Sequence, residues 1–451
     1  MDCSPRLRAL GLFDAKVPRY TSYPTAPQFS AGVGVSHFDH WVKEIPPLVE
    51  ISLYLHVPFC RRLCWFCACR TQGTQKLDPV QIYLETLKTE IRQLASILPA
   101  GVRIGHMHWG GGTPTLLTPQ MMTDLAGTVR AAIPMSETAE FSVEIDPNEI
   151  DQPRVDALAA ARMTRASIGV QDFDPEIQKT IGRIQSYEVT QQAAQMLRAA
   201  GVTSLNTDIL FGLPHQTTAR MATSVKQLLT LEPDRVALYG YAHVPWMARR
   251  QALIPSDALP TPQERLTLFE TAQKLFLQND YAAIGIDHFA RPSDSLTQAQ
   301  KSGTLRRNFQ GYTSDPYPVL IGLGASAISK FPQGYAQNDP STGGYTKSIR
   351  AGHFATTRGH TLSQDDKLRA RIIEALMCDF KVDISDLTGR GLGQPNDIHP
   401  LFERAAKTFA EFVDHSDQGF FIHPKGRALT RMIARQFDAY DMADSRHSSA
   451  I

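Results

Sequence analysis

Short apolar runs alternate with amphipathic segments along the middle of the chain, and this alternation constrains the fold more than any other feature. Strand-like runs lie at residues 51–57, 106–109, 141–145, 166–170, 205–211 and 236–242. Helical patterns follow at 78–98, from 119, and near 151–162, 186–200 and 216–231. Repeated strand–helix units predict an α/β fold with a parallel sheet and helices on its outer side.

The first of these helices carries the clearest boundary signals. Asp78 suits the N-cap and Pro79 suits the first helical position. The apolar residues that share one face at helical spacing are Val80, Leu84, Leu87, Ile91, Leu94 and Leu98. Gly201 stands where the C-terminal glycine of a later helix is expected.

The regions outside the alternation divide the chain further. Residues 1–49 are rich in proline and aromatic residues with little helical period, and they predict an ordered N-terminal arm. Thr261 and Glu264 form a capping box that opens a helix to about residue 279, and Gly-, Ser- and Thr-rich residues 334–359 indicate a connection. We expect three parts, which are the arm (1–49), a barrel domain with an edge extension (50–355) and a C-terminal helical domain (356–451).

Smaller elements complete this outline. Further strand-like pieces lie at 282–289 and 318–329, where they would extend the edge of the sheet. From about residue 361 the pattern becomes helical. A short hairpin at 419–423 then leads into a final helix from residue 425.

Composition limits the function classes. The chain has 451 residues, of which 42% are hydrophobic and 20% charged, as in ordinary soluble enzymes. Its net charge of +1 gives no field that would favour nucleic acid or an anionic membrane. No apolar run approaches the roughly 18 residues of a spanning helix, and the N-terminus lacks the apolar core of a signal peptide. We therefore expect a cytoplasmic protein, with a monomer as the default state.

The most unusual stretch, residues 54–71, holds four of the six cysteines. Four thiols within ten residues suggest a metal or cluster site rather than a disulfide framework. Structural zinc uses two well-separated Cys-x2-Cys pairs, and the pair Cys64 and Cys67 has no counterpart. With Cys60 they could instead hold three irons of a 4Fe–4S cluster and leave one iron open. Three structural thiols on one helix face are the remaining alternative, which Pro58 and the preceding strand oppose.

The spacing C-x3-C-x2-C, with Phe66 before the third cysteine, resembles the signature of radical S-adenosylmethionine (SAM) enzymes. Eight motifs extend the likeness, in the order YLHVPFCRRLCWFCAC, HWGGGTPT, SVEIDP, GVQDF, DILFGLP, YAHVP, GIDHFARP and RNFQGY. With PRYTSYPT at 18–25 and the C-terminal region, they resemble the oxygen-independent coproporphyrinogen III oxidases, also called dehydrogenases. The resemblance implies a partial (β/α)6 barrel, an arm that closes over the active site, and a small, mostly helical, winged-helix-like C-terminal lid.

In barrels of parallel strands, functional residues collect at the C-terminal ends of the strands. Here the cysteine loop and a triple glycine follow the first two strands, and Glu144, Gln171, Asp208 and Ala242 lie at or near the ends of the next four. Glycines let the backbone approach a ligand closely. Glu144 suits a ribose or an ammonium group, and Gln171 and Asp208 suit ribose hydroxyls. These groups therefore predict one ligand site on one rim.

The resemblance assigns roles to individual residues. It implies a 4Fe–4S cluster on Cys60, Cys64 and Cys67. Arg183 can pair with a carboxylate through two hydrogen bonds, although a surface helix arginine is the alternative. The SAM contacts implied are Tyr54, Phe66, Gly111, Gly112, Thr113, Glu144, Gln171, Arg183, Asp208, Ala242 and Ile328.

Cys69 is too close to Cys67 to be an obvious fourth ligand, and radical SAM chemistry needs that iron open. A buried structural cysteine is one alternative. In the resembled oxidases this position is also cysteine, whereas related haem-chaperone-like proteins typically carry an aromatic residue there and lack the PRYTSYPT arm. The resemblance therefore favours the oxidase, with Tyr54 and Cys69 as catalytic residues. A haem-binding delivery protein, and a radical SAM methyltransferase or haem-degrading relative, are the alternative functions.

The resembled reaction turns two propionate side chains of coproporphyrinogen III into vinyl groups and gives protoporphyrinogen IX for anaerobic haem biosynthesis. A 5′-deoxyadenosyl radical from SAM removes a hydrogen from the propionate β-carbon, and the substrate radical loses carbon dioxide and one electron. Two side chains require two SAM molecules per turnover, together with an unidentified electron donor and acceptor. The cationic residues that suit the propionates are Arg19, Arg291, Arg306 and Arg307, whereas His56, His243 and His288 are expected to be structural.

Overall fold

The computed structural model describes residues 4–440 and 449–451 and is built on a twelve-stranded sheet, in the order β16-β15-β14-β13-β1-β4-β5-β6-β7-β8-β10-β9. Six neighbouring strands within it are parallel. They are β1 (Glu50–Val57), β4 (Arg103–Gly111), β5 (Met135–Ile145), β6 (Arg165–Gln171), β7 (Ser204–Phe211) and β8 (Arg235–Gly240). The predicted parallel sheet is confirmed, but the sixth strand ends at Gly240 rather than at residue 242.

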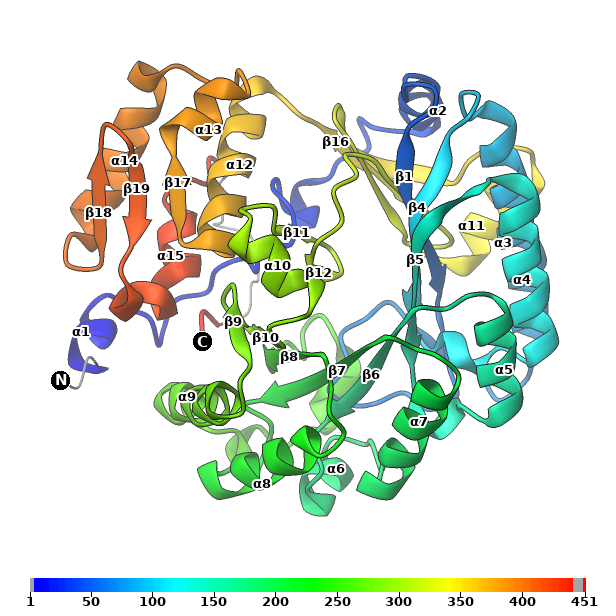
Figure 1. Cartoon of the computed structure of the whole chain (residues 1–451), viewed down its shortest axis with the longest axis horizontal. Coiled ribbons are helices and arrows are strands. Elements are labelled where there is room, and N and C mark those ends of the chain that lie inside the picture. The colour runs from blue at the N-terminus through cyan, green and yellow to red at the C-terminus, as the bar shows by residue number, and fades with distance from the viewer. Residues whose placement is uncertain (1–3, 441–448) are drawn as a thin grey trace.

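Helices cover the outer side of this curved sheet (Figure 1). They are α3 (Asp78–Ile97), α4 (Pro119–Ala132), α5 (Gln152–Ala160), α6 (Pro175–Thr180), α7 (Tyr187–Ala199), α8 (Thr218–Leu229) and α9 (Pro262–Gln278). α3 begins at Asp78 as predicted, but its N-cap is Leu77 rather than Asp78. Gly201 follows α7 with φ +91°, a conformation that favours glycine, as predicted. The parallel strands and these helices together form the partial (β/α)6 barrel.

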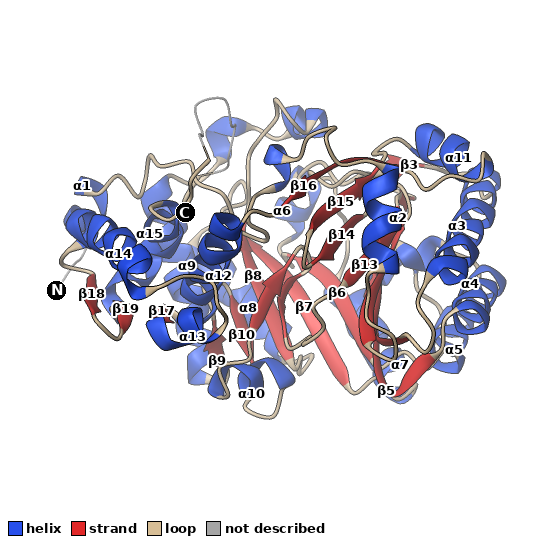
Figure 2. Cartoon of the chain, turned by 90° about the horizontal axis from the view of Figure 1, so that it is seen from above, coloured by secondary structure: helices blue, strands red, loops and turns tan. Residues whose placement is uncertain are grey.

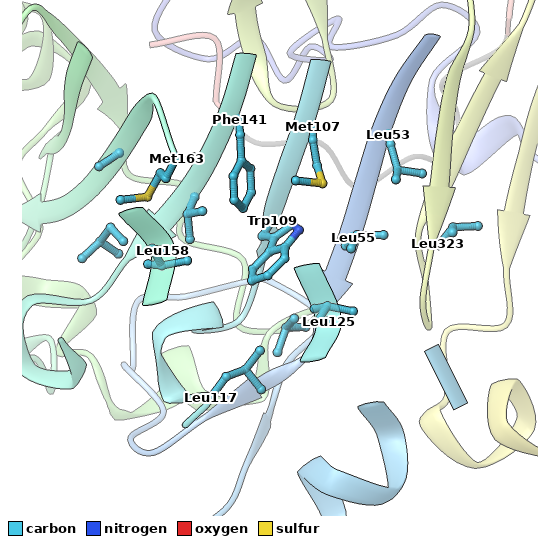
Figure 3. Packing of buried hydrophobic residues seen from close by; sticks show 14 of the residues in the cluster. Leu53, Leu55, Met107, Trp109, Leu117, Leu125, Phe141, Leu158, Met163 and Leu323 are labelled. Carbon is cyan, nitrogen blue, oxygen red and sulfur yellow. The ribbon is translucent and has the colours of Figure 1, made fainter. Parts of the chain in front are cut away.

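Side chains alternate between the two faces of each parallel strand. Leu55, Trp109 and Phe141 point toward the helices and are fully buried there (Figure 3). Each such side chain contributes roughly 1.5–3 kcal/mol through burial. The residues between them, such as Tyr54 and His108, point into the barrel, where many of the side chains are polar. The apolar face therefore holds the helices, and the other face is left for chemistry.

Both edges of the parallel sheet are extended. β9 (Ala282–Ile284) and β10 (His288–Ala290) form an antiparallel pair beside β8. At the other edge β13 (Leu320–Leu323) runs parallel to β1, and three antiparallel strands follow it. These strands are β14 (Ile328–Phe331), β15 (Gly334–Asn338) and β16 (Thr356–Thr361). The two predicted pieces at 282–289 and 318–329 are therefore each two strands.

Residues 334–359 are not a connection, contrary to the prediction. They form β15, α11 (Thr342–Arg350) and the start of β16. Glu90 of α3 explains the attachment, because its buried carboxylate accepts hydrogen bonds from Asn338 Nδ2 and Tyr345 Oη, both at 2.8 Å. β16 also carries the sheet past residue 355, where the barrel domain was expected to end.

The N-terminal arm contains α1 (Ser4–Ala9) and α2 (Val35–Lys43), although little helical period was expected there. Its two ends pack into different cores. Phe13 and Tyr20 belong to the core of the C-terminal domain, whereas Trp41 of α2 packs into the core of the barrel. The arm therefore joins the two parts of the molecule.

The C-terminal domain packs a three-stranded antiparallel sheet against helices and lies beside the open side of the barrel (Figures 1 and 2). The predicted hairpin is formed by β18 and β19, and the last helix starts at residue 430 after a 3-10 turn. Among the residues described, no helix is both long and apolar enough to cross a membrane. The elements are α12 (Gln364–Asp379), β17 (Lys381–Asp383), α13 (Ile384–Gly389), α14 (Pro395–Phe409), β18 (Val413–Ser416), β19 (Gly419–Ile422) and α15 (Thr430–Arg435).

Candidate active site

The cysteine loop projects from the C-terminal end of β1 and is closed at its base. β2 (Phe59–Cys60) pairs in parallel with β3 (Gln72–Gly73), so the chain leaves and returns at one point. The carbonyl of Cys60 accepts the N–H of Thr74 at 2.9 Å, and the carbonyl of Phe59 accepts the N–H of Thr113 at 2.8 Å. The loop and the triple glycine at the end of β4 are therefore joined through the backbone.

The thiols of Cys60, Cys64 and Cys67 are free and partly exposed. Burial, together with the charges of Cys67 and Cys64, raises the pKa of Cys60 to about 11. The thiol and the N–H of Cys69 hydrogen-bond to Cys67 and lower the pKa of that thiol to about 6. The three sulfurs thus lie within electrostatic reach of one another.

This donor set fits an iron–sulfur cluster in its chemistry, because closely spaced thiolates in one loop are its typical ligands. Over the described part of the chain, no three His, Cys, Asp or Glu side chains stand in a ready-made metal arrangement. Cys69 is exposed, which excludes the alternative of a buried structural cysteine.

Arg183 links the cysteine loop to the ends of two strands. Its Nη1 lies 3.5 Å from Cys64 Sγ and 3.4 Å from Asp146 Oδ2, and its Nη2 donates to the carbonyl of Gly169 at 3.0 Å. Its side chain is only 13% exposed. The alternative of a surface helix arginine is therefore wrong, and a guanidinium stands beside the thiols.

Glu144 organises the turn after β4. Its Oε2 accepts the N–H of Gly111 at 3.0 Å, and its Oε1 lies 3.4 Å from His108 Nε2. Burial favours the neutral acid, but the hydrogen bonds from His108 and Gly111 outweigh it and leave the pKa of Glu144 below its ordinary value. A carboxylate charge is therefore held on the inner rim.

Two glycines of this turn have no room for a side chain. A Cβ at Gly111, whose φ is +113°, would lie 2.5 Å from the His56 ring, and one at Gly112 would lie 2.6 Å from the carbonyl oxygen of Phe59. Thr113, which follows them, is buried. Glycine is therefore required at both positions by the packing of the turn. The predicted close approach of this backbone to a ligand stays a prediction.

Asp208 and Gln171 lie on neighbouring strands further round the rim. Asp208 Oδ1 accepts from Asn206 Nδ2 at 2.9 Å, and burial raises the pKa of Asp208 to about 7. Gln171 has φ +69°, an unfavourable conformation for a residue with a side chain. Such strain is typical of functional sites.

Tyr54, Phe66, Ala242 and Ile328 also reach this rim. Tyr54 stacks on His108 at 5.8 Å between ring centroids, and its hydroxyl lies 2.9 Å from His56 Nδ1. Ile328 begins β14 against Gly322, which is paired in register with Tyr54. The Gln251 amide donates to the carbonyls of Phe66 at 2.7 Å and Ala242 at 3.0 Å.

Comparisons with known proteins agree with this geometry. Residues 54–228 match the model of the Radical SAM superfamily. The oxygen-independent coproporphyrinogen III oxidase of Paracoccus denitrificans is 60% identical over the full length of both chains. That of Escherichia coli is 38% identical over 94% of this chain and 93% of its own. The chain belongs to the oxygen-independent coproporphyrinogen III oxidase family.

A solved structure supports the fold of this family for the chain. The coproporphyrinogen III oxidase of Escherichia coli, described as a radical SAM enzyme, superposes with a TM-score of 0.90 at 36% identity, covering 95% of this chain and all of that one. Another relative, from Cereibacter sphaeroides, is 54% identical over 96% of this chain and 97% of its own. Membership in the radical SAM family implies a 4Fe–4S cluster and SAM as cofactors.

A charged layer at the floor of the barrel escaped the sequence analysis. His106 Nε2 lies 3.1 Å from Glu140, which forms two hydrogen bonds with Arg165, at 2.6 and 2.8 Å. Burial opposes ionisation, but His106 and Arg165 hold the pKa of Glu140 well below its usual range. The signal was present in the alternation of charged residues with buried apolar ones along β4, β5 and β6.

The histidines and arginines selected from the motifs lie in different surroundings. His56, His243 and His288 are all hydrogen-bonded to neighbouring side chains, as expected of structural histidines. Arg19 and Arg307 meet near the barrel opening, where Arg307 Nη2 lies 3.4 Å from the carbonyl of Arg19. Arg306 pairs across from Thr313 in a short hairpin, and Arg291 lies at the opposite end of β8 from the rim.

Proposed function

We propose that this chain catalyses the oxidative decarboxylation of two propionate side chains of coproporphyrinogen III to vinyl groups, giving protoporphyrinogen IX for haem biosynthesis. The observation that carries the proposal is the full-length match, at 60% identity, to a relative named for this activity. It is supported by the convergence of the cysteine loop, Glu144 and Asp208 on one rim of the barrel.

Different residues of the rim would bind different parts of the cofactors. Cys60, Cys64 and Cys67 would hold the cluster, which together with SAM supplies a radical able to abstract hydrogen from the substrate. The backbone at Gly111 and Gly112 is open to the amino-acid part of SAM, and the Arg183 guanidinium suits its carboxylate. The Glu144 carboxylate suits an ammonium or a ribose hydroxyl.

We assign the remaining cofactor contacts from the places of these residues around the rim. Gln171 and Asp208 suit the ribose hydroxyls, whereas Phe66, Thr113, Ala242 and Ile328 border the same space. Tyr54 and Cys69 are our proposed catalytic residues, the first beside the glycine turn and the second hydrogen-bonded to Cys67. Two SAM molecules would be consumed per turnover, one for each propionate.

The chain itself must hold an anionic substrate away from water. Arg19 and Arg307 lie where the arm crosses the open side of the barrel, and Asp287 is the carboxylate whose charge acts on both. We propose that they face substrate propionates, whereas Arg291 is withdrawn from this role because of its place. The exposed cysteine loop suits an external electron donor; the donor and the final acceptor are unidentified. We further propose a cytoplasmic monomer.

The proposal is tested by anaerobic turnover. The protein is reconstituted with iron and sulfide and then given a reductant, SAM and coproporphyrinogen III. We expect protoporphyrinogen IX, with two molecules of 5′-deoxyadenosine per porphyrinogen. Deoxyadenosine without the porphyrinogen product would move the substrate assignment elsewhere. Neither product from a protein with an intact cluster would favour the haem-delivery alternative.

Asp208 gives a pH-dependent prediction for SAM binding. Its pKa of about 7 means that the carboxylate is largely protonated at pH 6 and ionised at pH 8. Only the ionised form accepts hydrogen bonds with both oxygens, so the Kd for SAM should fall about tenfold over this interval. Calorimetric titration of the reconstituted protein measures it. Asp208→Asn should remove the pH dependence, whereas Asp156→Asn on the exposed side of α5 should retain it.

A further inference from the structure

A cationic pocket lies between the arm, the sheet edge and the C-terminal domain. Its volume is about 200 Å³, and its wall includes residues 20–23 of the arm, Lys330 of β14, and Lys367 and Arg371 of α12. Arg307, from β11 (Arg306–Asn308), completes the wall. Four cationic side chains thus face one carboxylate, that of Glu374. A cavity with this balance of charge suits an anion.

Arg307 is the most unusual member of this wall. Its side chain is 3% exposed and stacks 4.4 Å from the centroid of the Tyr312 ring. Its Nη2 donates to the carbonyl of Arg19, but Nε and Nη1 find no hydrogen-bond acceptor among the residues described, and Asp287 stays 3.8 Å away. A buried donor without an acceptor destabilises the fold. These nitrogens are therefore available to a ligand.

The one carboxylate of the pocket is already engaged. Glu374 Oε2 accepts from Arg371 Nη1 at 3.2 Å, and Oε1 accepts the backbone N–H of Arg307 at 3.4 Å. Arg371 also donates to Asp386 at 2.7 Å. Within residues 4–440 and 449–451, no ion pair is formed by Lys330 or Lys367. Two ammonium groups therefore line the cavity without an ion-pair partner among the described residues.

Buried polar groups connect Arg307, in the wall of the pocket, to the rim. Arg307 lies beside Asp287, whose Oδ1 is 2.7 Å from His288 Nδ1, and His288 Nε2 is 3.4 Å from the hydroxyl of Tyr239. Tyr239 lies on β8 beside β7, the strand that carries Asp208, so its hydroxyl connects His288 to the rim. A ligand held at the rim could therefore extend an arm toward Arg307.

We propose that this pocket binds a carboxylate, namely that of a substrate propionate that is not reacting while another propionate stands at the rim. The assignment to the substrate rests on the proposed function. About 200 Å³ is below the roughly 300–1,000 Å³ of sites that enclose a whole drug-sized ligand. The pocket therefore takes one arm of the porphyrinogen, and the macrocycle stays in the barrel opening.

Binding of coproporphyrin III, the oxidised form that does not react, tests this proposal without turnover. Lys330→Gln should raise its Kd about tenfold, the factor that one lost charged hydrogen bond represents. Lys347→Gln, at an exposed position on α11, is the matched control and should bind like the wild type. Lys367→Gln serves as a second pocket variant if Lys330→Gln unfolds. Fluorescence quenching gives the Kd, and thermal unfolding checks each fold.

The Kd of the tetramethyl ester of coproporphyrin III separates the contribution of charge to binding from that of shape. It should bind equally to the wild type and to Lys330→Gln, because it has no carboxylate. Equal Kd values of coproporphyrin III for both pocket variants and the control would overturn the proposal. The proposal would also be overturned if sodium propionate stabilises the wild type but not Lys330→Gln while the Kd of coproporphyrin III is the same for both proteins. The pocket would then bind free anions only. If binding depends on Lys330 but no vinyl product forms, the pocket stands and the proposed function fails.

Discussion

Cys64→Ala is expected to abolish both 5′-deoxyadenosine and protoporphyrinogen IX, a loss of more than about a thousandfold in the rate of product formation. The cluster would lose one of its three protein ligands, and Arg183 would lose the sulfur that lies 3.5 Å from its Nη1. Product analysis after anaerobic turnover measures the effect. Iron and sulfide content and the visible absorption spectrum of the reconstituted protein report whether the cluster is held.

Cys378→Ala is the matched control for this prediction. Cys378 is a free cysteine of α12 in the C-terminal domain and is fully buried. Its replacement should cost some stability but leave iron content and both products unchanged. Normal iron content and product formation in Cys64→Ala would contradict the assignment of the cluster to residues 60–67. A loss in both variants would indicate damage to the fold instead.

The parallel sheet and most of its rim could be predicted from the sequence because their signals are local. Leu53 and Leu55 alternate with polar neighbours along β1, and short apolar runs recur in the five strands that follow. Once the strands are parallel, their last residues must share one edge. Glu144 and Asp208 thus come together although 64 positions separate them in the sequence.

The edge extension could not be predicted because it depends on distant partners. Nothing near residue 338 indicates that Glu90 will accept a hydrogen bond from Asn338. The position of Arg291 could not be predicted from its motif either. It lies in one motif with His288, but β10 is antiparallel to β8, so residues after His288 run toward the start of β8. The two residues therefore point to opposite ends of the barrel region.

The arm and the C-terminal domain supply side chains whose role depends on how distant parts of the chain pack together. Tyr20 of the arm donates to Asp438 at 3.0 Å, and Arg431 of α15 donates to the carbonyl of Pro18 at 3.0 Å. These contacts hold the arm across the open side of the barrel. A residue such as Lys330 belongs to the sheet, yet it faces a cavity only because α12 and the arm close over it. No local pattern could reveal that.

Glu144→Ala is expected to weaken SAM binding about a hundredfold, because it removes a charged hydrogen-bond acceptor worth roughly 1.5–3 kcal/mol and frees the turn that it holds. The N–H of Gly111 would lose its acceptor at 3.0 Å, and His108 would lose the carboxylate beside its Nε2. Glu144→Gln should have the smaller effect, about tenfold, since an amide oxygen can still accept from Gly111. Calorimetric titration of SAM into the reconstituted protein gives both values.

Glu137→Ala separates the role of this carboxylate from a general effect of charge. Glu137 lies on β5, the same strand as Glu144, but its side chain is exposed to solvent. Its removal should leave the Kd for SAM within about twofold of the wild type. If Glu144→Ala binds SAM as tightly as Glu137→Ala does, the carboxylate only supports the glycine turn. The SAM ammonium and ribose must then be held by other groups on the rim, with Asp208 the first to examine.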